Sequence, residues 1–387
     1  MTETTSDVTV VGAGPAGLLA ALLTARTGAR TTLIAPKAQP DSRTTALLDR
    51  SIAILREAGV WAEVADASAP LRKLRIVDGG RRLIRTPEVT FDSAELGLEA
   101  FGWNVPNVAL VAALERAAEA EPGLSRIESP ALESRPGPDA VVIRHEGGAV
   151  ASQLAIAADG RRSLLREAAR IALDLTPQNQ TALAFSIAHS SGHHDVSTEF
   201  QCEEGPCVLV PMPGGFASSV VWVVTPERAE ALRAEAPTTF AAELTRRTGR
   251  LLGDIRLAGP IGAFPVEVGS ATRLAARRTL LVGEAGHVLP PIGAQGLNLG
   301  VRDAAAAARQ TALARAEGRD PGDAGAMAGY ERDRAGDVHS RTLATDLLNR
   351  SLLSVAPPVH LARGIGLTAL AAIGPLRRFV MRQGVGG

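Results

Sequence analysis

Six residues near the start of the chain have the types and spacing of a phosphate-binding loop: Gly12-Ala13-Gly14-Pro15-Ala16-Gly17. In such a loop the first glycine permits a tight turn, the second lets a pyrophosphate approach the backbone, and the third lets a helix pack closely on a strand. The free N–H groups and the dipole at the start of that helix favour negative charge. The loop therefore predicts a dinucleotide site formed by Gly12, Gly14, Pro15, Ala16 and Gly17.

The elements around this loop are those that the site requires. Residues 8–11 are β-branched and predict a buried strand, residues 18–27 predict a helix that ends at Gly28, and residues 31–34 predict a second strand. An acid that contacts the adenosine ribose normally follows the second strand, but Ala35 occupies that position. Asp41 lies farther on, in a predicted loop, so we expect Lys37 and Arg43 to contribute to ribose binding.

Two later segments also follow hydrophobic strands and carry polar or glycine-rich turns. Asp159-Gly160 follows a strand predicted at 154–158, and Gly283-Glu284 follows one at 279–282. The second segment continues through Pro290 and Pro291 to Asp303, with a helix predicted over 297–317. In isolation, Asp159-Gly160 would be an ordinary turn. The order of the three segments is what makes them informative.

Composition limits the possible function classes. The chain of 387 residues is 45% hydrophobic and 21% charged, so it can bury a large core. Lys and Arg together number 41, as do Asp and Glu, which gives no overall attraction to nucleic acid. The two cysteines, Cys202 and Cys207, are expected to be reduced thiols. His193 and His194 lack further ligands at metal-binding spacing, so no metal site is expected.

The three segments, taken together, resemble those of the single-component FAD-dependent aromatic monooxygenases, and within them the ubiquinone-biosynthesis flavin hydroxylases. The similarity covers nearly the whole chain, and residues 291–303 are its most specific part. Further matching residues are residues 41–47, Asn107, Leu110, Gly205, Pro206, Pro211, Trp222, Phe264, Pro265, Tyr330, Arg334, Asp346 and Arg363.

Together with the pattern of elements, the resemblance implies a mixed α/β fold. A Rossmann-like FAD-binding domain would comprise residues 1–175 and 266–345, and a β-sheet substrate domain at 176–265 would be interleaved with it. Residues 71–103 could join the substrate sheet, and residues 346–387 would form a C-terminal helical region. One helix is expected at 51–64 and another at 240–248.

The resemblance also implies that FAD is bound in an extended pose. Asp159 and Gly160 would line the pyrophosphate side, and Gly283 with Glu284 would hold the ribityl or nearby sugar hydroxyls. The stretch from Pro291 to Asn298 would pass the pyrimidine edge of the flavin. The other cofactor residues expected are Arg43, Thr44, Gly293, Ala294, Gln295, Gly296 and Leu297, and the candidate substrate contacts are Trp222 and Pro290, although core packing is the favoured role of Trp222.

Three positions depart from the family pattern. Glu284 stands where the family has aspartate, and Gly293-Ala294 reverses the more usual Ala-Gly order. Ala35 replaces the ribose acid. These departures bear on how tightly FAD is held, and they leave FAD as the expected ligand.

The resemblance implies hydroxylation of the ring of a polyprenylated phenol in ubiquinone biosynthesis, with NAD(P)H as transient reductant and a flavin C4a-hydroperoxide as oxidant. No catalytic side chain is expected, because the cofactor carries the chemistry. One alternative is hydroxylation of another small aromatic compound. An aromatic acid would need a pairing arginine, which residues 181–188 and 207–224 lack. A flavin reductase acting on prenyl double bonds and a non-catalytic flavoprotein that scaffolds a biosynthetic complex are further alternatives.

The end of the chain is basic and apolar. After Asp346 there is no acidic residue. Basic residues are interleaved there with apolar ones. The basic residues are Arg350, Arg363, Arg377, Arg378 and Arg382, and the apolar residues are Leu361, Ile365, Leu367, Leu370, Ile373, Leu376, Phe379 and Val380. Such a tail suits the surface of a membrane, which would place a cytoplasmic protein at the inner face of the membrane. The alternative is a helical pair packed on the body. A biosynthetic complex or a homodimer is also possible.

Overall fold

The structure, a computed structural model, describes residues 2–37, 39–80, 87–202, 204–291, 293–353, 364, 366, 368–370 and 372–385. The first of its sheets has the strand order β18-β19-β11-β1-β2-β8, with β10 and β9 continuing antiparallel from β11. Its strands are β1 (Thr2–Val11), β2 (Thr31–Ile34), β8 (Leu124–Ile127), β9 (Ala131–Pro136), β10 (Val141–His145), β11 (Gly148–Ala157), β18 (Ala275–Ala276) and β19 (Thr279–Leu281).

The strands β19, β11, β1, β2 and β8 are parallel, so both faces of the sheet must be covered. On one face α1 (Pro15–Ala25) packs between α4 (Asn107–Glu119) and α8 (Gln295–Ala316), in one apolar core with the sheet. On the other face α5 (Leu164–Ala168) and the β9–β10 hairpin enclose a second core. The result is the three-layered, Rossmann-like arrangement predicted from the glycine loop.

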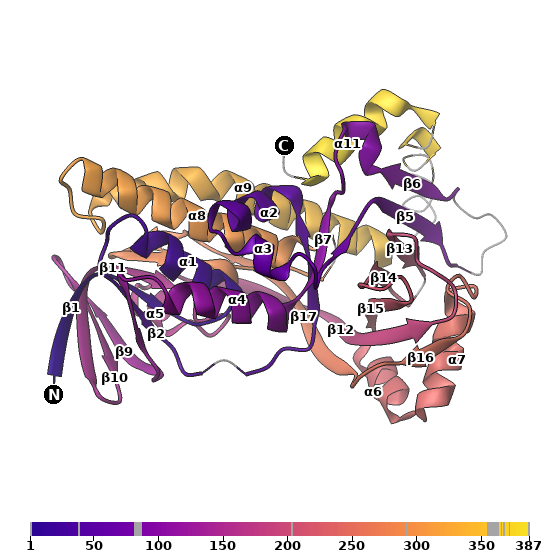
Figure 1. Ribbon diagram of the computed structural model, residues 1–387, viewed down its shortest axis with the longest axis horizontal. Helices are drawn as coiled ribbons and strands as arrows, with labels where there is room; N and C mark the ends of the chain where they lie inside the picture. The colour runs from indigo at the N-terminus through magenta and orange to yellow at the C-terminus, as the bar shows by residue number, and fades with distance from the viewer. Residues whose placement is uncertain are drawn as a thin grey trace.

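The second sheet has the order β20-β17-β12-β15-β14-β13-β5-β6, with β16 also paired to β12. Its strands are β5 (Lys73–Asp78), β6 (Val89–Asp92), β12 (Leu173–His189), β13 (Val196–Gln201), β14 (Cys207–Pro211), β15 (Ala217–Val224), β16 (Ile255–Leu257), β17 (Gly262–Ala271) and β20 (His287–Val288). The long paired strands β12 and β17 belong to this second sheet and extend from it toward the first (Figure 1). Because β5 pairs with β13, residues within 71–103 lie in this sheet.

One face of the second sheet is covered by α6 (Pro226–Ala234) and α7 (Pro237–Arg247), at the lower right of Figure 1. The helix expected at 240–248 is thus α7, which begins three residues before the expected start, at Pro237. Helix α6 was not predicted from the sequence, although Thr225 caps it and Pro226 is its first residue. The helix expected at 51–64 is wrong as one element: α2 (Asp49–Glu57) and α3 (Trp61–Val64) are separated at Gly59, whose φ is +65°.

The remaining elements connect the two sheets and close the chain. They are the three-stranded sheet of β3 (Thr44–Leu48), β4 (Ala69–Pro70) and β7 (Gly102–Pro106), the short helices η1 (Ser93–Leu96) and η2 (Gly283–Ala285), α9 (Ala324–Leu353) and α11 (Gly374–Val385). Helix α9 lies beside α8 and runs unbroken across residue 345, and α11 packs near η1 (Figure 1). The sequence predicts that the helical tail is broken at Pro375, and residue 373 is indeed non-helical, with α11 beginning at Gly374 and Pro375 in its first turn. The breaks predicted at Pro357 and Pro358 lie outside the described residues.

Candidate functional site

The parallel strands of the first sheet end at one level. Val11 of β1 pairs with Ile34 of β2 and with Ala157 of β11, and Ala157 pairs with Leu281 of β19. The segments that follow these strands therefore emerge side by side at the carboxyl edge of the sheet. They are the segments that begin at Gly12, Ala35, Ala158 and Val282, so the structure brings together the regions singled out from the sequence.

The glycines of the first loop have distinct roles. A Cβ on Gly12, whose φ is +112°, would lie 2.1 Å from the carbonyl oxygen of Ala158, and a Cβ on Gly17 would lie 2.0 Å from that of Gly12. Gly12 and Gly17 are therefore needed for the packing of β1, α1 and β11. A Cβ on Gly14 would meet nothing within 4 Å. The backbone at Gly14 and the first turn of α1 thus remain open to a phosphate group, as FAD binding requires.

Asp159 lies at the start of the next segment and is largely buried. Its Oδ2 accepts a hydrogen bond from the Leu165 N–H at 3.4 Å, and its Oδ1 is buried without a partner. Burial raises the pKa of this carboxyl above its ordinary value, although hydrogen bonds from Ser163 and Leu165 act in the opposite direction. A buried acceptor without a partner is costly, and a hydroxyl or N–H group of a bound cofactor would satisfy it. This observation fits the predicted role of Asp159.

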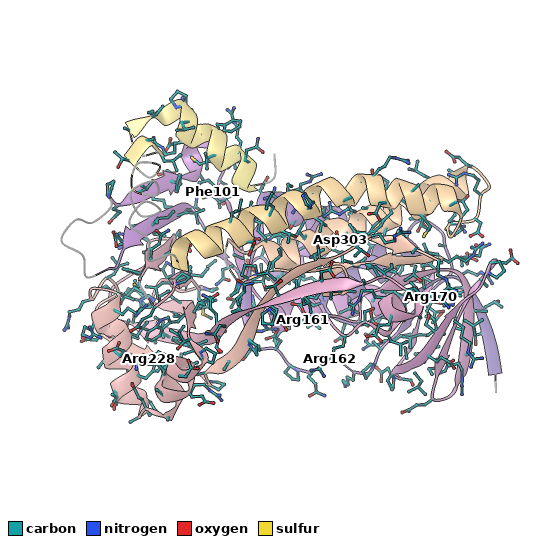
Figure 2. All side chains as sticks on the ribbon, turned by 180° about the vertical axis from the view of Figure 1, so that it is seen from behind. Phe101, Arg161, Arg162, Arg170, Arg228 and Asp303 are labelled. Carbon is teal, nitrogen blue, oxygen red and sulfur yellow. The ribbon has the colours of Figure 1, made fainter. Side chains whose placement is uncertain are left out.

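Glu284 is engaged by an arginine that the sequence reading did not single out. Arg161 donates to both carboxylate oxygens of Glu284, at 3.0 and 3.2 Å, and to Glu267 on β17 at 3.3 Å. Arg161 lies near the middle of the molecule, between Arg170 at one end and Arg228 at the other (Figure 2). The side chain of Glu284 is 54% exposed, so it can still accept hydrogen bonds from sugar hydroxyls.

The segment before α8 has an unusual backbone. Gly293 and Ala294 both have left-handed conformations, with φ of +66° and +54°. A Cβ on Gly293 or Gly296 would meet nothing within 4 Å, so the backbone there is open. The N–H groups in the first turn of α8 provide positive potential that suits the pyrimidine edge of a flavin. Ile292, within this predicted segment, lies outside the described residues.

Asn298 has a structural role that the sequence did not indicate. Its amide donates to the carbonyl oxygens of Ala46 at 2.8 Å and Ala294 at 2.5 Å, and its Oδ1 accepts from the Leu48 N–H and the Ser51 hydroxyl. The side chain therefore holds β3 and α2 against the start of α8. Leu297 beside it is half-buried and packs on the main core.

Asp303 joins the glycine-glutamate turn to α9. This buried carboxylate accepts hydrogen bonds from the Gly283 N–H at 3.0 Å, from His287 Nε2 at 2.6 Å and from Arg334 Nε at 2.7 Å. Burial alone would raise its pKa, but His287 and Arg334 outweigh that effect and lower the pKa to about 2. His287 is thus a hydrogen-bonded structural residue. Figure 2 labels Asp303, the residue of α8 at the centre of this network.

A pocket of about 380 Å³ lies where the carboxyl edge of the first sheet meets the second sheet. Its sheet wall is formed by residues of β12 and β15, among them the small side chains of Ala182, Ala184 and Ser219, with Phe264 to Glu267 of β17 beside them. Its residues are Ser42, Arg43, Thr44, Arg161, Ala182, Ala184, Phe185, Ser186, Ser219, Val220, Val221, Ala258, Gly259, Pro260, Phe264, Pro265, Val266, Glu267, Glu284, Leu289 and Pro291. The predicted cofactor residues Arg43, Thr44, Glu284 and Pro291 are thus brought together with the sheet.

Two of these residues are held in place by neighbours. Arg43 forms an ion pair with Asp41 at 2.8 Å and stacks on the Phe264 ring, with 4.6 Å between the guanidinium carbon and the ring centroid. Burial acts to raise the pKa of Asp41, but hydrogen bonds from Arg43 and Asn107 outweigh it and lower that pKa. The Thr44 hydroxyl donates to Ser219 Oγ at 2.7 Å and so links β3 to β15.

Four predicted residues do not line this pocket. Trp222 is fully buried on the opposite face of the second sheet, against Phe240 of α7, and does not line the pocket. Pro290 is buried beside the pocket without lining it. Ala35 is buried, and its N–H donates to the carbonyl oxygen of Ile127. Lys37 is exposed. The substrate role suggested for Trp222 is therefore replaced by core packing, because alternation along β15 turns its ring away.

Comparison with known proteins identifies the cofactor of this site. The family described as an FAD binding domain matches residues 5–339. The ubiquinone hydroxylase UbiL of Rhodospirillum rubrum is 32% identical over 98% of this chain and 90% of that protein. The chain belongs to the FAD-dependent ubiquinone hydroxylase family. The chain is an FAD-dependent monooxygenase.

One further relative and one solved structure are similar to the chain. The 3-demethoxyubiquinol 3-hydroxylase of Escherichia coli is 29% identical over 100% of both chains. Among solved structures, p-nitrophenol 4-monooxygenase PnpA from Pseudomonas putida DLL-E4 is similar in fold, with a TM-score of 0.82, 19% identity and coverage of 100% of this chain and 99% of that one. The resemblance, the α/β fold class and the FAD cofactor predicted from the sequence are confirmed.

Proposed function

We propose that this chain hydroxylates the aromatic ring of a polyprenylated phenol in ubiquinone biosynthesis, with FAD as cofactor and NAD(P)H as reductant. The observation that carries the proposal is the pocket, which lies between the residues expected to hold FAD and a sheet wall that includes small side chains. The similarity to proteins named ubiquinone hydroxylase and 3-demethoxyubiquinol 3-hydroxylase supports the substrate class.

The protein's own contribution is to bind and orient. The backbone at Gly14 and the start of α1 would hold the pyrophosphate, while Asp159 and Glu284 would accept hydrogen bonds from hydroxyls of the cofactor. When bound and reduced by NAD(P)H, FAD would activate O₂, so that one oxygen atom is transferred to an electron-rich ring and the other leaves as water. Ala182 and Ala184 leave room for that ring, and the Thr44–Ser219 hydrogen bond joins the two sides of the pocket.

The charges around the pocket favour a neutral phenol over an aromatic acid. Both arginines that line it are already paired: Arg43 with Asp41, and Arg161 with Glu267 and Glu284. Three carboxylates therefore accompany two guanidinium groups, so a carboxylate on the substrate would have to compete for its partner. A phenol needs no such partner. This is the same conclusion that the arginine-free strands indicated from the sequence.

Filling the pocket tests the proposal. Ala184 of β12 lines the pocket, whereas Ala188, four residues along the same strand and on the same face, does not. We expect Ala184→Leu to lower kcat/KM for a prenylated phenol while FAD binding is retained, and Ala188→Leu to leave kcat/KM unchanged. Equal activity of Ala184→Leu and the unchanged protein would place the substrate elsewhere.

We also infer that the tail contacts the membrane surface. One side of α11 packs on the body, through Met381 in a small core with Phe91 and through Arg377, which pairs with Glu95 at 2.8 Å. The other side is apolar and exposed, and its Phe379 is 60% exposed. Both alternatives for the tail therefore find support: it is a packed helix that leaves an apolar face free, flanked by basic residues.

Several of the basic and apolar tail residues lie outside the part of the chain that the structure describes. Leu361, Arg363, Ile365 and Leu367 lie outside the described residues, and so does the side chain of Arg350. None of the helices in the described part of the chain is long and apolar enough to cross a bilayer. The inference therefore rests on α11.

Vesicle binding tests the contact. Phe379→Ser is expected to weaken co-sedimentation with anionic phospholipid vesicles, because it removes the most exposed apolar side chain of the helix. Leu132→Ser, at a similarly exposed apolar residue far along the first sheet, is the matched control. Equal vesicle binding by both variants and the unchanged protein would contradict the inference.

A further inference from the structure

One guanidinium group lies between the tail helix and the start of α8. Arg341 of α9 donates from Nη1 to Gln295 Oε1 at 3.2 Å and to the Gly384 carbonyl oxygen at 3.4 Å. Its Nη2 donates to the Gln383 carbonyl oxygen at 3.3 Å, and its Nε donates to Asp337 Oδ1 at 3.3 Å. Arg341 therefore contacts α8, α9 and α11 at once.

The contacts to α11 are of a kind that stabilises a helix end. The carbonyl groups in the last turn of a helix have no partners within the helix and carry its partial negative charge. Gln383 and Gly384 belong to that last turn of α11, and their carbonyl oxygens accept hydrogen bonds from Arg341. The position of α11 and the orientation of the Arg341 side chain therefore depend on each other.

The contact to α8 leads directly to the loop expected at the flavin. Gln295 is the first residue of α8, and while its Oε1 accepts from Arg341, its Nε2 donates to the Gly293 carbonyl oxygen at 3.0 Å. Gly293 and Ala294 have the left-handed conformations described above. Arg341 thus fixes the side chain that spans this strained turn.

A second chain of contacts leads from Arg341 to the other cofactor loop. Asp337 also accepts a hydrogen bond from Arg334 Nη1 at 2.6 Å. Arg334 in turn donates to Asp303, and Asp303 accepts from the Gly283 N–H beside Glu284. The four side chains are largely buried, so these bonds are little screened by solvent.

We propose that Arg341 is a positioning residue that couples docking of the tail helix α11 to the shape of the two FAD loops, 283–285 and 293–298. The docked tail holds Arg341, and Arg341 holds Gln295 and Asp337 in the arrangement that binds FAD. Because coupling between two equilibria is reciprocal, bound FAD also favours the docked tail. The proposal rests on the FAD part of the proposed function and does not depend on which ring is hydroxylated.

The test uses full-length protein and measures FAD directly. Arg341→Met keeps an apolar stem and removes the four hydrogen bonds. We expect the Kd for FAD to rise about tenfold, the effect of losing one hydrogen bond to a charged group. The flavin absorbance maximum is expected to shift, and amide exchange at residues 293–298 to become faster. Arg332→Met, at an exposed arginine on the same helix, should change none of these.

A double-mutant cycle tests the coupling itself. Arg377→Gln breaks the ion pair with Glu95 that holds α11 on the body, far from both FAD loops. This variant should also raise the Kd for FAD, but it should have no further effect when Arg341 is already methionine. Arg341→Lys, which keeps the charge and some donors, should restore part of the affinity. It also carries the test if Arg341→Met does not fold.

Two results would overturn the proposal. One is an unchanged Kd for FAD and an unchanged flavin spectrum in Arg341→Met. The other is a double variant in which the losses simply add, since the tail would then act on FAD by another route. Neither readout requires hydroxylation, so failure of the proposed reaction and failure of the coupling can be told apart.

Discussion

Replacing Gly14 by alanine separates the binding of FAD from the stability of the fold. The backbone of Gly14, with φ of −70° and ψ of 170°, is one that alanine adopts without strain, and the new Cβ would meet no protein atom within 4 Å. Gly→Ala changes at compatible positions stabilise proteins by about 0.4–1 kcal/mol, because the unfolded chain loses freedom. Gly14 is also the N-cap of α1, where alanine is less favourable than glycine, and this opposes the gain. We therefore expect the stability of the apoprotein to change little.

FAD binding, by contrast, should weaken. The methyl group would stand in the space that a pyrophosphate needs beside the backbone. A hydrogen bond to a charged group contributes about 1.5–3 kcal/mol, so the loss of one such bond raises the Kd for FAD roughly 10- to 100-fold. Titration with FAD, followed by flavin fluorescence, measures this Kd, and urea unfolding of the apoprotein measures the stability.

Gly17→Ala is the matched control, because its Cβ would lie 2.0 Å from the Gly12 carbonyl oxygen. Such overpacking costs about 1–3 kcal/mol, so this variant should unfold at a lower urea concentration. Two outcomes would refute the reasoning. Gly14→Ala could bind FAD as tightly as the unchanged protein, or it could be destabilised as much as Gly17→Ala.

Three further predictions concern the loops around the cofactor. Ala294→Gly should raise the urea midpoint slightly, since a left-handed residue with a Cβ costs about 1–2 kcal/mol and the added chain entropy of glycine offsets only part of that; a lower midpoint would contradict it. Asp303→Asn should reduce the free energy of unfolding by up to about 3–5 kcal/mol, because the buried Arg334 would keep only Asp337 as a carboxylate partner, whereas the more exposed Asp333→Asn should cost no more than about 1 kcal/mol. The lowered pKa of Asp303, about 2 against 3.8, contributes stability that is present at neutral pH and is lost as pH falls from about 5 through 2; Asp303→Asn should unfold with a weaker acid dependence, and an unchanged dependence would count against the assignment.

The parts of the site that could be predicted from the sequence depend on local backbone requirements. The contacts at Gly12 and Gly17 arise within a single strand–turn–helix unit, so their spacing along the chain already indicates the geometry. The level ends of β1, β11 and β19 follow from their being parallel neighbours in one sheet. These features need little information about distant parts of the chain.

The parts that were missed depend on contacts between segments far apart in the sequence. Asn298 bonds to residues some 250 positions away, and the partner of Glu284 is Arg161, 123 positions away. No local pattern specifies such pairs. Trp222 illustrates another limit: alternation shows that it shares a face with Val224, but it does not show which face of a covered sheet lines the pocket.

The central claim is tested most directly by following an oxygen atom. Purified protein with FAD, NAD(P)H and a prenylated phenol would be incubated under isotopically heavy O₂, and the product would be analysed by mass spectrometry. The account predicts that the aromatic ring gains one heavy oxygen atom, with consumption of NAD(P)H that depends on the phenol. Bound flavin without any incorporation of oxygen into the ring would contradict it.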